Sequence, residues 1–80
     1  MNKKLLRSIM ILHDDTNDML AAALGITPQR LSAKINETGG AEFTQREIKI
    51  IKIRYKLTPE QVDAIFFVDD VSFLDTRKDE

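Results

Sequence analysis

The chain has 80 residues, of which 42% are hydrophobic and 31% are charged, and it contains no cysteine. This length fits one small domain and excludes a two-domain enzyme, while the composition is that of a globular protein with a packed core. The lack of cysteine excludes disulfide bonds and thiolate metal sites. The formal net charge of −1 argues against a protein that coats nucleic acid through bulk positive charge.

The charge is distributed unevenly along the chain. Residues 1–56 contain ten basic and six acidic side chains, a net charge of +4, whereas residues 57–80 contain two basic and seven acidic ones, a net charge of −5. Such an asymmetry favours nucleic acid as a partner of the first segment. The basic side chains near the start, Lys3, Lys4 and Arg7, are interpreted as solvated charges of a first helix, with a DNA-binding arm as the less favoured alternative.

Apolar spacing and local start signals predict five short helices. They comprise residues 3–13, 17–24 and 28–36, a fourth helix that begins after Thr44, and a fifth from Thr58 to about residue 67. Four threonines stand where an N-cap is expected, and two of them begin a capping box. These are Thr16, Thr27, Thr44 with Glu47, and Thr58 with Gln61. Gly25 is expected to end the second helix in a left-handed conformation.

One segment allows two interpretations. In residues 50–57 apolar and basic side chains alternate, which suits a half-buried strand, but Ile48, Ile51 and Tyr55 also have helical spacing. The capping box at Thr44 favours the helix, and the strand remains the alternative.

Helices 17–24 and 28–36 are separated only by Gly25, Ile26 and Thr27. Two helices joined by so short a turn, with the small Ala21 on the first, can cross closely at a steep angle, as in a helix-turn-helix. From the spacing alone, a DNA-binding unit and an ordinary helical bundle are equally compatible with the sequence.

The segment 16–36 resembles the helix-turn-helix of the phage repressor and Cro proteins, also called the lambda-repressor-like or XRE family. The matching residues are Thr16, Leu20 and Ala21, then Leu24, Gly25 and Ile26, then Leu31, Ser32, Lys34, Ile35 and Asn36. With the helix after Thr44, the resemblance covers roughly residues 3–67. It implies an all-α fold: a compact bundle of about five short helices with a helix-turn-helix, the lambda-repressor-like DNA-binding domain.

The resemblance also implies which residues contact DNA. The base-contacting residues would be Pro28, Gln29, Ser32 and Ala33, and the residues near the DNA backbone would be Asn17, Thr27, Arg30 and Asn36. Gln29 can pair bidentately with adenine, whereas Pro28 offers no side-chain hydrogen bond, so specificity is expected to depend also on backbone contacts and DNA shape. Lys34 is predicted to be a phosphate contact or a solvated charge.

The function expected on these grounds is that of a cytoplasmic, sequence-specific double-stranded DNA-binding transcriptional regulator, a repressor-like protein of phage or prophage type. It would place residues 28–36 in the major groove and bind a palindromic operator as a homodimer. No catalytic residues, metal site, cofactor or membrane partner are expected. The alternative is a protein-interaction module on a helix-turn-helix scaffold with weak or no DNA binding.

The expected domain organisation is a helix-turn-helix domain in residues 1–68 followed by an acidic C-terminal segment in residues 69–80. Large apolar side chains gather around this boundary, more than five short helices need for their core. They are Phe66, Phe67, Val71, Phe73 and Leu74. The C-terminal segment is therefore expected to be either an association element or a disordered tail.

Overall fold

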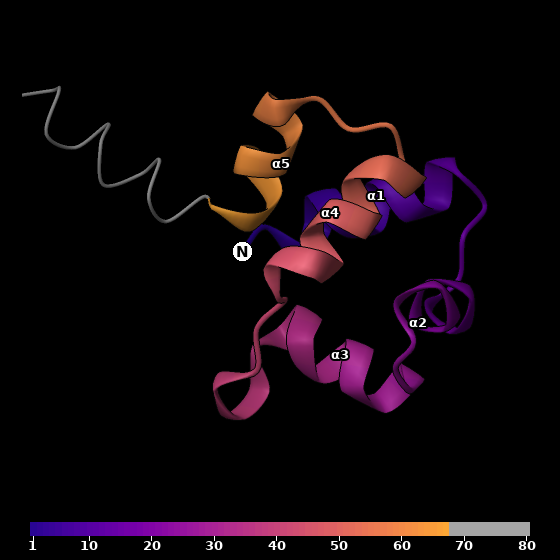
Figure 1. The fold of residues 1–80 in the computed structure, drawn as a ribbon, viewed down its shortest axis with the longest axis vertical. Helices are drawn as coiled ribbons and strands as arrows, with labels where there is room; N and C mark the ends of the chain where they lie inside the picture. Colours follow the sequence, from indigo (N-terminus) through magenta and orange to yellow (C-terminus); the bar gives the residue numbers. More distant parts are fainter. Residues whose placement is uncertain (68–80) are drawn as a thin grey trace, which may run out of the picture.

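In the computed structural model, which describes residues 1–67, the chain forms five α-helices (Figure 1). They are α1 (Lys3–Leu12), α2 (Asn17–Leu24), α3 (Pro28–Asn36), α4 (Gln45–Arg54) and α5 (Pro59–Phe66), with a short 3-10 turn at Thr38–Gly40. Residues 1–67 contain no strand, so the all-α prediction is confirmed for them. The predictions for residues 69–80, including Val71, Phe73 and Leu74, and the boundary at residue 68 lie outside the described residues.

The helices begin where the sequence predicts, because short-range side-chain hydrogen bonds fix their first turns. Each predicted N-cap hydroxyl accepts a hydrogen bond of 3.2 Å from the backbone N–H three residues later, at Thr16, Thr27, Thr44 and Thr58. Both predicted capping boxes are formed, with Glu47 and Gln61 as the returning side chains. A cap that the sequence analysis did not predict is Asn2, whose Oδ1 accepts from the N–H of Leu5 at 3.1 Å.

Each of the first four helices is followed by a residue in the left-handed conformation. These residues are Asp14, Gly25, Glu37 and Lys56, with φ of 53°, 74°, 56° and 53°. In α1, α2 and α4 the next N–H bonds a carbonyl five residues back, at distances of 2.8 to 3.0 Å, which is the Schellman arrangement. Of these four left-handed residues only Gly25 was predicted, because only glycine adopts this conformation without a steric cost.

The ambiguous segment 50–57 is helical as far as Arg54 and then turns. Burial explains why the helix is preferred to a strand. Ile51, Tyr55 and Leu57 are buried, whereas Ile53 is 71% exposed, so the apolar alternation does not correspond to one buried face. The helical spacing of Ile51 and Tyr55 does correspond to one buried face, because both side chains are buried.

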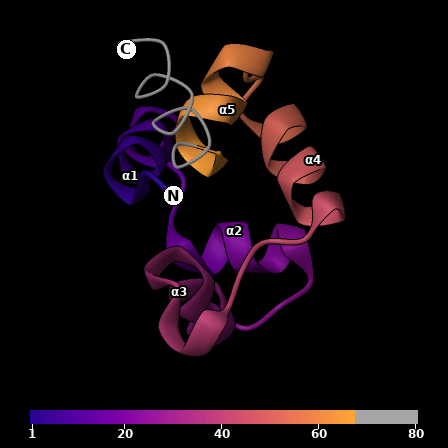
Figure 2. The same cartoon turned by 90° about the vertical axis from the view of Figure 1, so that its left-hand side faces the viewer.

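The core lies between the helices, each of which contributes buried side chains. Figure 2 shows α1 and α4 on opposite sides, α5 across one end, and α2 followed by α3 at the other end. The side chains that are at most 2% exposed are Leu6, Leu20, Ala21, Leu24, Leu31, Ile35, Ile51 and Ile65. A backbone hydrogen bond of 2.7 Å from the N–H of Asn2 to the carbonyl of Ile65 joins the start of α1 to α5.

Candidate nucleic-acid interface

Helices α2 and α3 form a tight two-helix unit. Figures 1 and 2 show that they cross steeply, because each is seen nearly end-on in the view in which the other lies across the picture. Gly25 makes the turn, and the N–H of Ile26 bonds the carbonyl of Ala21 at 3.0 Å. Ala21 is 1% exposed, so its methyl group leaves little room between the packed helices for a larger side chain.

The start of α3 is presented to solvent. Thr27, Pro28, Gln29 and Arg30 are all exposed, whereas Leu31 and Ile35 are buried on the other side of the helix. Two further expected base contacts, Ser32 and Ala33, are only half-buried. The structure therefore brings the four expected base-contacting residues to the accessible part of one helix, where side chains can reach a partner.

The two asparagines expected near phosphates are also exposed. Asn17 is the first residue of α2, and Asn36 is the last residue of α3. The Oδ1 of Asn36 accepts a hydrogen bond of 3.3 Å from the Nζ of Lys3 in α1. Thr27 combines exposure with its capping role, since its hydroxyl already accepts from the N–H of Arg30.

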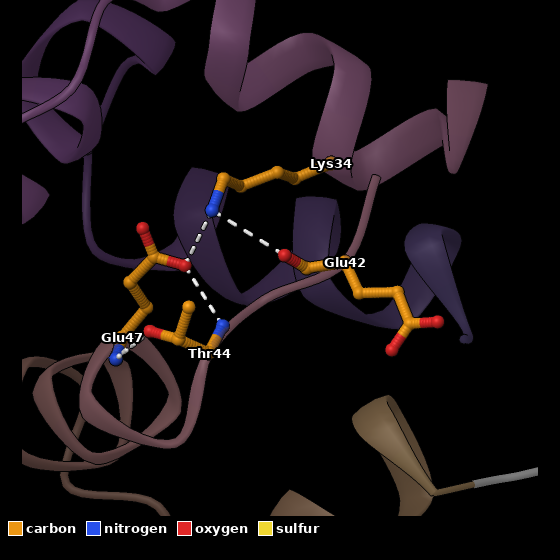
Figure 3. Close-up of polar contacts among 4 residues, drawn as sticks. All are labelled: Lys34, Glu42, Thr44 and Glu47. Atoms are coloured by element: carbon orange, nitrogen blue, oxygen red, sulfur yellow. Dashed lines mark hydrogen bonds and ion pairs between the residues drawn. The ribbon is translucent and has the colours of Figure 1, made fainter. Parts of the chain in front are cut away.

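The position of Lys34 corrects the sequence analysis. Lys34 was expected on the surface, as a phosphate contact or a solvated charge, but it is 6% exposed and points into the protein. Figure 3 shows its ammonium group between two acceptors: the Oε1 of Glu47 at 2.7 Å and the backbone carbonyl of Glu42 at 3.3 Å. A buried ammonium needs such partners, because losing water without them costs several kcal/mol.

Glu47 is the centre of this network. Its Oε1 also accepts from the N–H of Thr44 at 2.9 Å, so one carboxylate closes the capping box of α4 and pairs with the lysine of α3 (Figure 3). Burial acts to raise the pKa of Glu47, but the hydrogen bonds from Lys34 and Thr44 outweigh it and hold that pKa below its ordinary value. The end of α3 is thus attached to the start of α4 by a charged contact.

A second polar cluster attaches the start of α2 to the end of α4. Asp15, which is 9% exposed, accepts from the Nε and the terminal nitrogen of Arg54, both at 2.7 Å, and from the hydroxyl of Tyr55. The hydrogen bond from Arg54 is the main reason that the pKa of Asp15 is lowered. Burial, together with the bond to Asp15, raises the pKa of Tyr55.

Comparison with known proteins gave no match to any family model, curated protein or solved structure. The two-helix unit and its exposed side chains are therefore the observations on which a function can be argued. Among residues 1–67, no helix combines the length and the apolar character needed to cross a membrane. The same residues hold no group of three His, Cys, Asp or Glu side chains placed to bind a metal ion.

Two basic residues that the sequence analysis interpreted as solvated charges lie beside the predicted phosphate contacts. Lys3 bonds Asn36, as described above, and Arg7 lines a hollow of about 340 Å³ together with Asn17. Their spacing of four residues, which puts both on one side of α1, was the available signal. The sequence alone does not reveal which part of the fold that side faces.

Proposed function

We propose that this protein is a sequence-specific double-stranded DNA-binding regulator of transcription, of the phage repressor and Cro type. In this proposal α3 enters the major groove with its first residues toward the bases. Gln29 contacts a base edge, Arg30 contacts a phosphate or a guanine, and Asn17 and Asn36 contact the backbone. Such a regulator would act in the cytoplasm, where bacterial and phage DNA is found.

The observation that carries the proposal is the exposed start of α3 on a firmly attached helix. Pro28, Gln29 and Arg30 are exposed, although Leu31 and Ile35 on the same helix are buried and Lys34 is bonded to Glu47. A helix fixed on one side and polar on the other can present side chains to a groove at little cost in conformational entropy.

The size of α3 supports a homodimer on a palindromic operator as part of this proposal. Its nine residues span only about 14 Å, which corresponds to roughly four base pairs. Few base contacts give weak discrimination, because each is worth about 1–3 kcal/mol. Two copies related by a two-fold axis, with half-sites about one helical turn apart, would double the number of bases contacted.

Selection of random duplex DNA by the full-length protein at near-physiological salt tests the proposal. The expected result is an enriched motif made of two inverted half-sites about one helical turn apart. Selection with a Gln29→Ala variant in parallel is expected to return the same motif with one position relaxed in each half-site. Failure of the wild-type protein to enrich any motif would contradict sequence-specific binding.

Exposed apolar side chains favour a second candidate, a protein-interaction module on the same scaffold. Ile11, Leu12 and Ile53 are 74%, 83% and 71% exposed, which is high for large apolar residues. This candidate predicts that no motif is enriched and that association does not depend on Gln29 or Arg30. The selection experiment therefore distinguishes the two candidates directly.

A further inference from the structure

Two basic side chains of α1 lie beside the two-helix unit. Lys3 and Arg7 are exposed and four residues apart, so they lie on the same side of α1, separated by about 6 Å along its axis. The Nζ of Lys3 donates to Asn36 at the end of α3, and Arg7 shares a hollow with Asn17 at the start of α2. Each basic group therefore accompanies one exposed amide of the two-helix unit.

These two charges are not neutralised within the described part of the chain. Among residues 1–67, neither Lys3 nor Arg7 forms an ion pair with a carboxylate. The acidic group that lines the hollow with Arg7 is Asp15, and its carboxylate is already bonded to Arg54 and Tyr55. Both basic groups thus retain hydrogen-bond donors and charge for an external anion.

We propose that Lys3 and Arg7, with Asn36 and Asn17 beside them, form a strip of phosphate contacts next to α3. This inference rests on the proposed DNA-binding function. Two flexible cations one helical turn apart can follow neighbouring phosphates of one strand, and each amide can donate to the phosphate held by its basic neighbour. The strip sets the position of the protein on the duplex and contributes no base preference.

The salt dependence of binding to a selected duplex tests this strip. Each lost phosphate contact makes the plot of log K against log salt concentration less steep by about 0.9. Lys3→Ala and Arg7→Ala are each expected to show this change. When the salt concentration rises from 50 to 200 mM, the factor by which the affinity of each variant falls is then about 3.5 times smaller than the factor for the wild type. The preferred sequence stays the same, and Arg7→Lys restores the wild-type slope.

Lys4→Ala is the matched control, because it removes the same charge from an exposed neighbouring position of α1. Its slope is expected to equal that of the wild type. The strip is overturned if Lys3→Ala and Arg7→Ala also keep the wild-type slope, or if Lys4→Ala changes it equally, which would indicate bulk charge. A wild-type protein that binds no duplex overturns the proposed function and the strip together, whereas intact sequence preference with unchanged slopes overturns the strip alone.

Discussion

The ammonium group of Lys34 lies 2.7 Å from a carboxylate oxygen of Glu47, and both side chains are shielded from water. The pair joins the last turn of α3 to the first turn of α4, next to the capping box at Thr44. An apolar contact at this place would tolerate small shifts of α3, whereas a charged hydrogen bond requires a defined geometry. Lys34 thus helps to fix the orientation of the helix that presents Gln29.

Lys34→Met is expected to destabilise the protein by about 3–5 kcal/mol, because it leaves the buried carboxylate of Glu47 without its counter-ion. Combining it with Glu47→Gln removes that charge and keeps an amide oxygen to accept from Thr44. The double variant is expected to be more stable than Lys34→Met alone. Urea unfolding measures the four free energies of the double-mutant cycle, and strictly additive effects would show that the two residues are not coupled.

Acid is expected to weaken the fold through Asp15 and Glu47, whose pKa values are lowered in the folded protein. Their stabilising effect is complete above the ordinary values of 3.8 and 4.5 and is lost as the pH falls through the lower folded-state values. Thermal unfolding between pH 7 and pH 2 measures this loss. The double variant Asp15→Asn, Glu47→Gln is expected to be less stable than the wild type at pH 7 but to lose less stability on acidification. Asp63→Asn, at an exposed position, is expected to keep the wild-type dependence of stability on pH.

Lys56→Gly is expected to stabilise the protein by about 1 kcal/mol, because φ at this position is 53° and a Cβ is unfavourable there. Lys49→Gly is the matched control. It also removes an exposed lysine side chain, but from the interior of α4, where the helical backbone makes glycine unfavourable by about 1 kcal/mol. The two variants should therefore shift the urea midpoint in opposite directions, and a shift in the same direction would contradict the role of the left-handed turn.

Ala21→Leu tests the close crossing of α2 and α3. The extra atoms have no space at a position that is 1% exposed, so a loss of about 1–3 kcal/mol is expected together with weaker DNA binding. Ala22→Leu, on the exposed side of the same helix, is expected to leave both properties close to wild type. Equal stability of the two variants in thermal unfolding would show that the crossing tolerates a large side chain.

Under the proposed function, Gln29→Ala and Arg30→Ala are expected to separate base contacts from phosphate contacts. Gln29→Ala is expected to relax the preference at one base pair at a cost of about 1–3 kcal/mol. If Arg30 contacts a phosphate, Arg30→Ala weakens binding to all sequences alike and makes the salt slope less steep by about 1. Fluorescence anisotropy titrations with matched and mismatched duplexes measure both effects, and unchanged binding by both variants would refute these assignments.

The helix starts were predictable because their signals are local. A threonine hydroxyl and an N–H three residues later need no tertiary structure to meet, so all four predicted caps are found. The ends of the helices at 3–13 and 28–36 were predicted to within a residue, but the left-handed conformation of Asp14, Glu37 and Lys56 was not, since non-glycine residues adopt positive φ only when the following chain imposes it.

The polar contacts that hold the two-helix unit depend on the tertiary arrangement. Asp15 and Arg54 are 39 residues apart, and no local pattern pairs them. For Lys34 a signal was present: it stands three residues after Leu31 and one before Ile35, which are both buried, and so belongs to the inward face of α3. Its charge led to the surface prediction, because lysine is rarely buried without a partner.

Helix α4 holds the two-helix unit at both of its own ends, through Glu47 at its start and Arg54 at its finish. None of these contacts involves the side chains of Pro28, Gln29 or Arg30. Under the proposed function, the residues that choose a DNA sequence and those that keep the fold are separate sets. Binding preference can then diversify by substitution at positions 29 and 30 with little effect on stability, so the scaffold is suited to acquiring new operators.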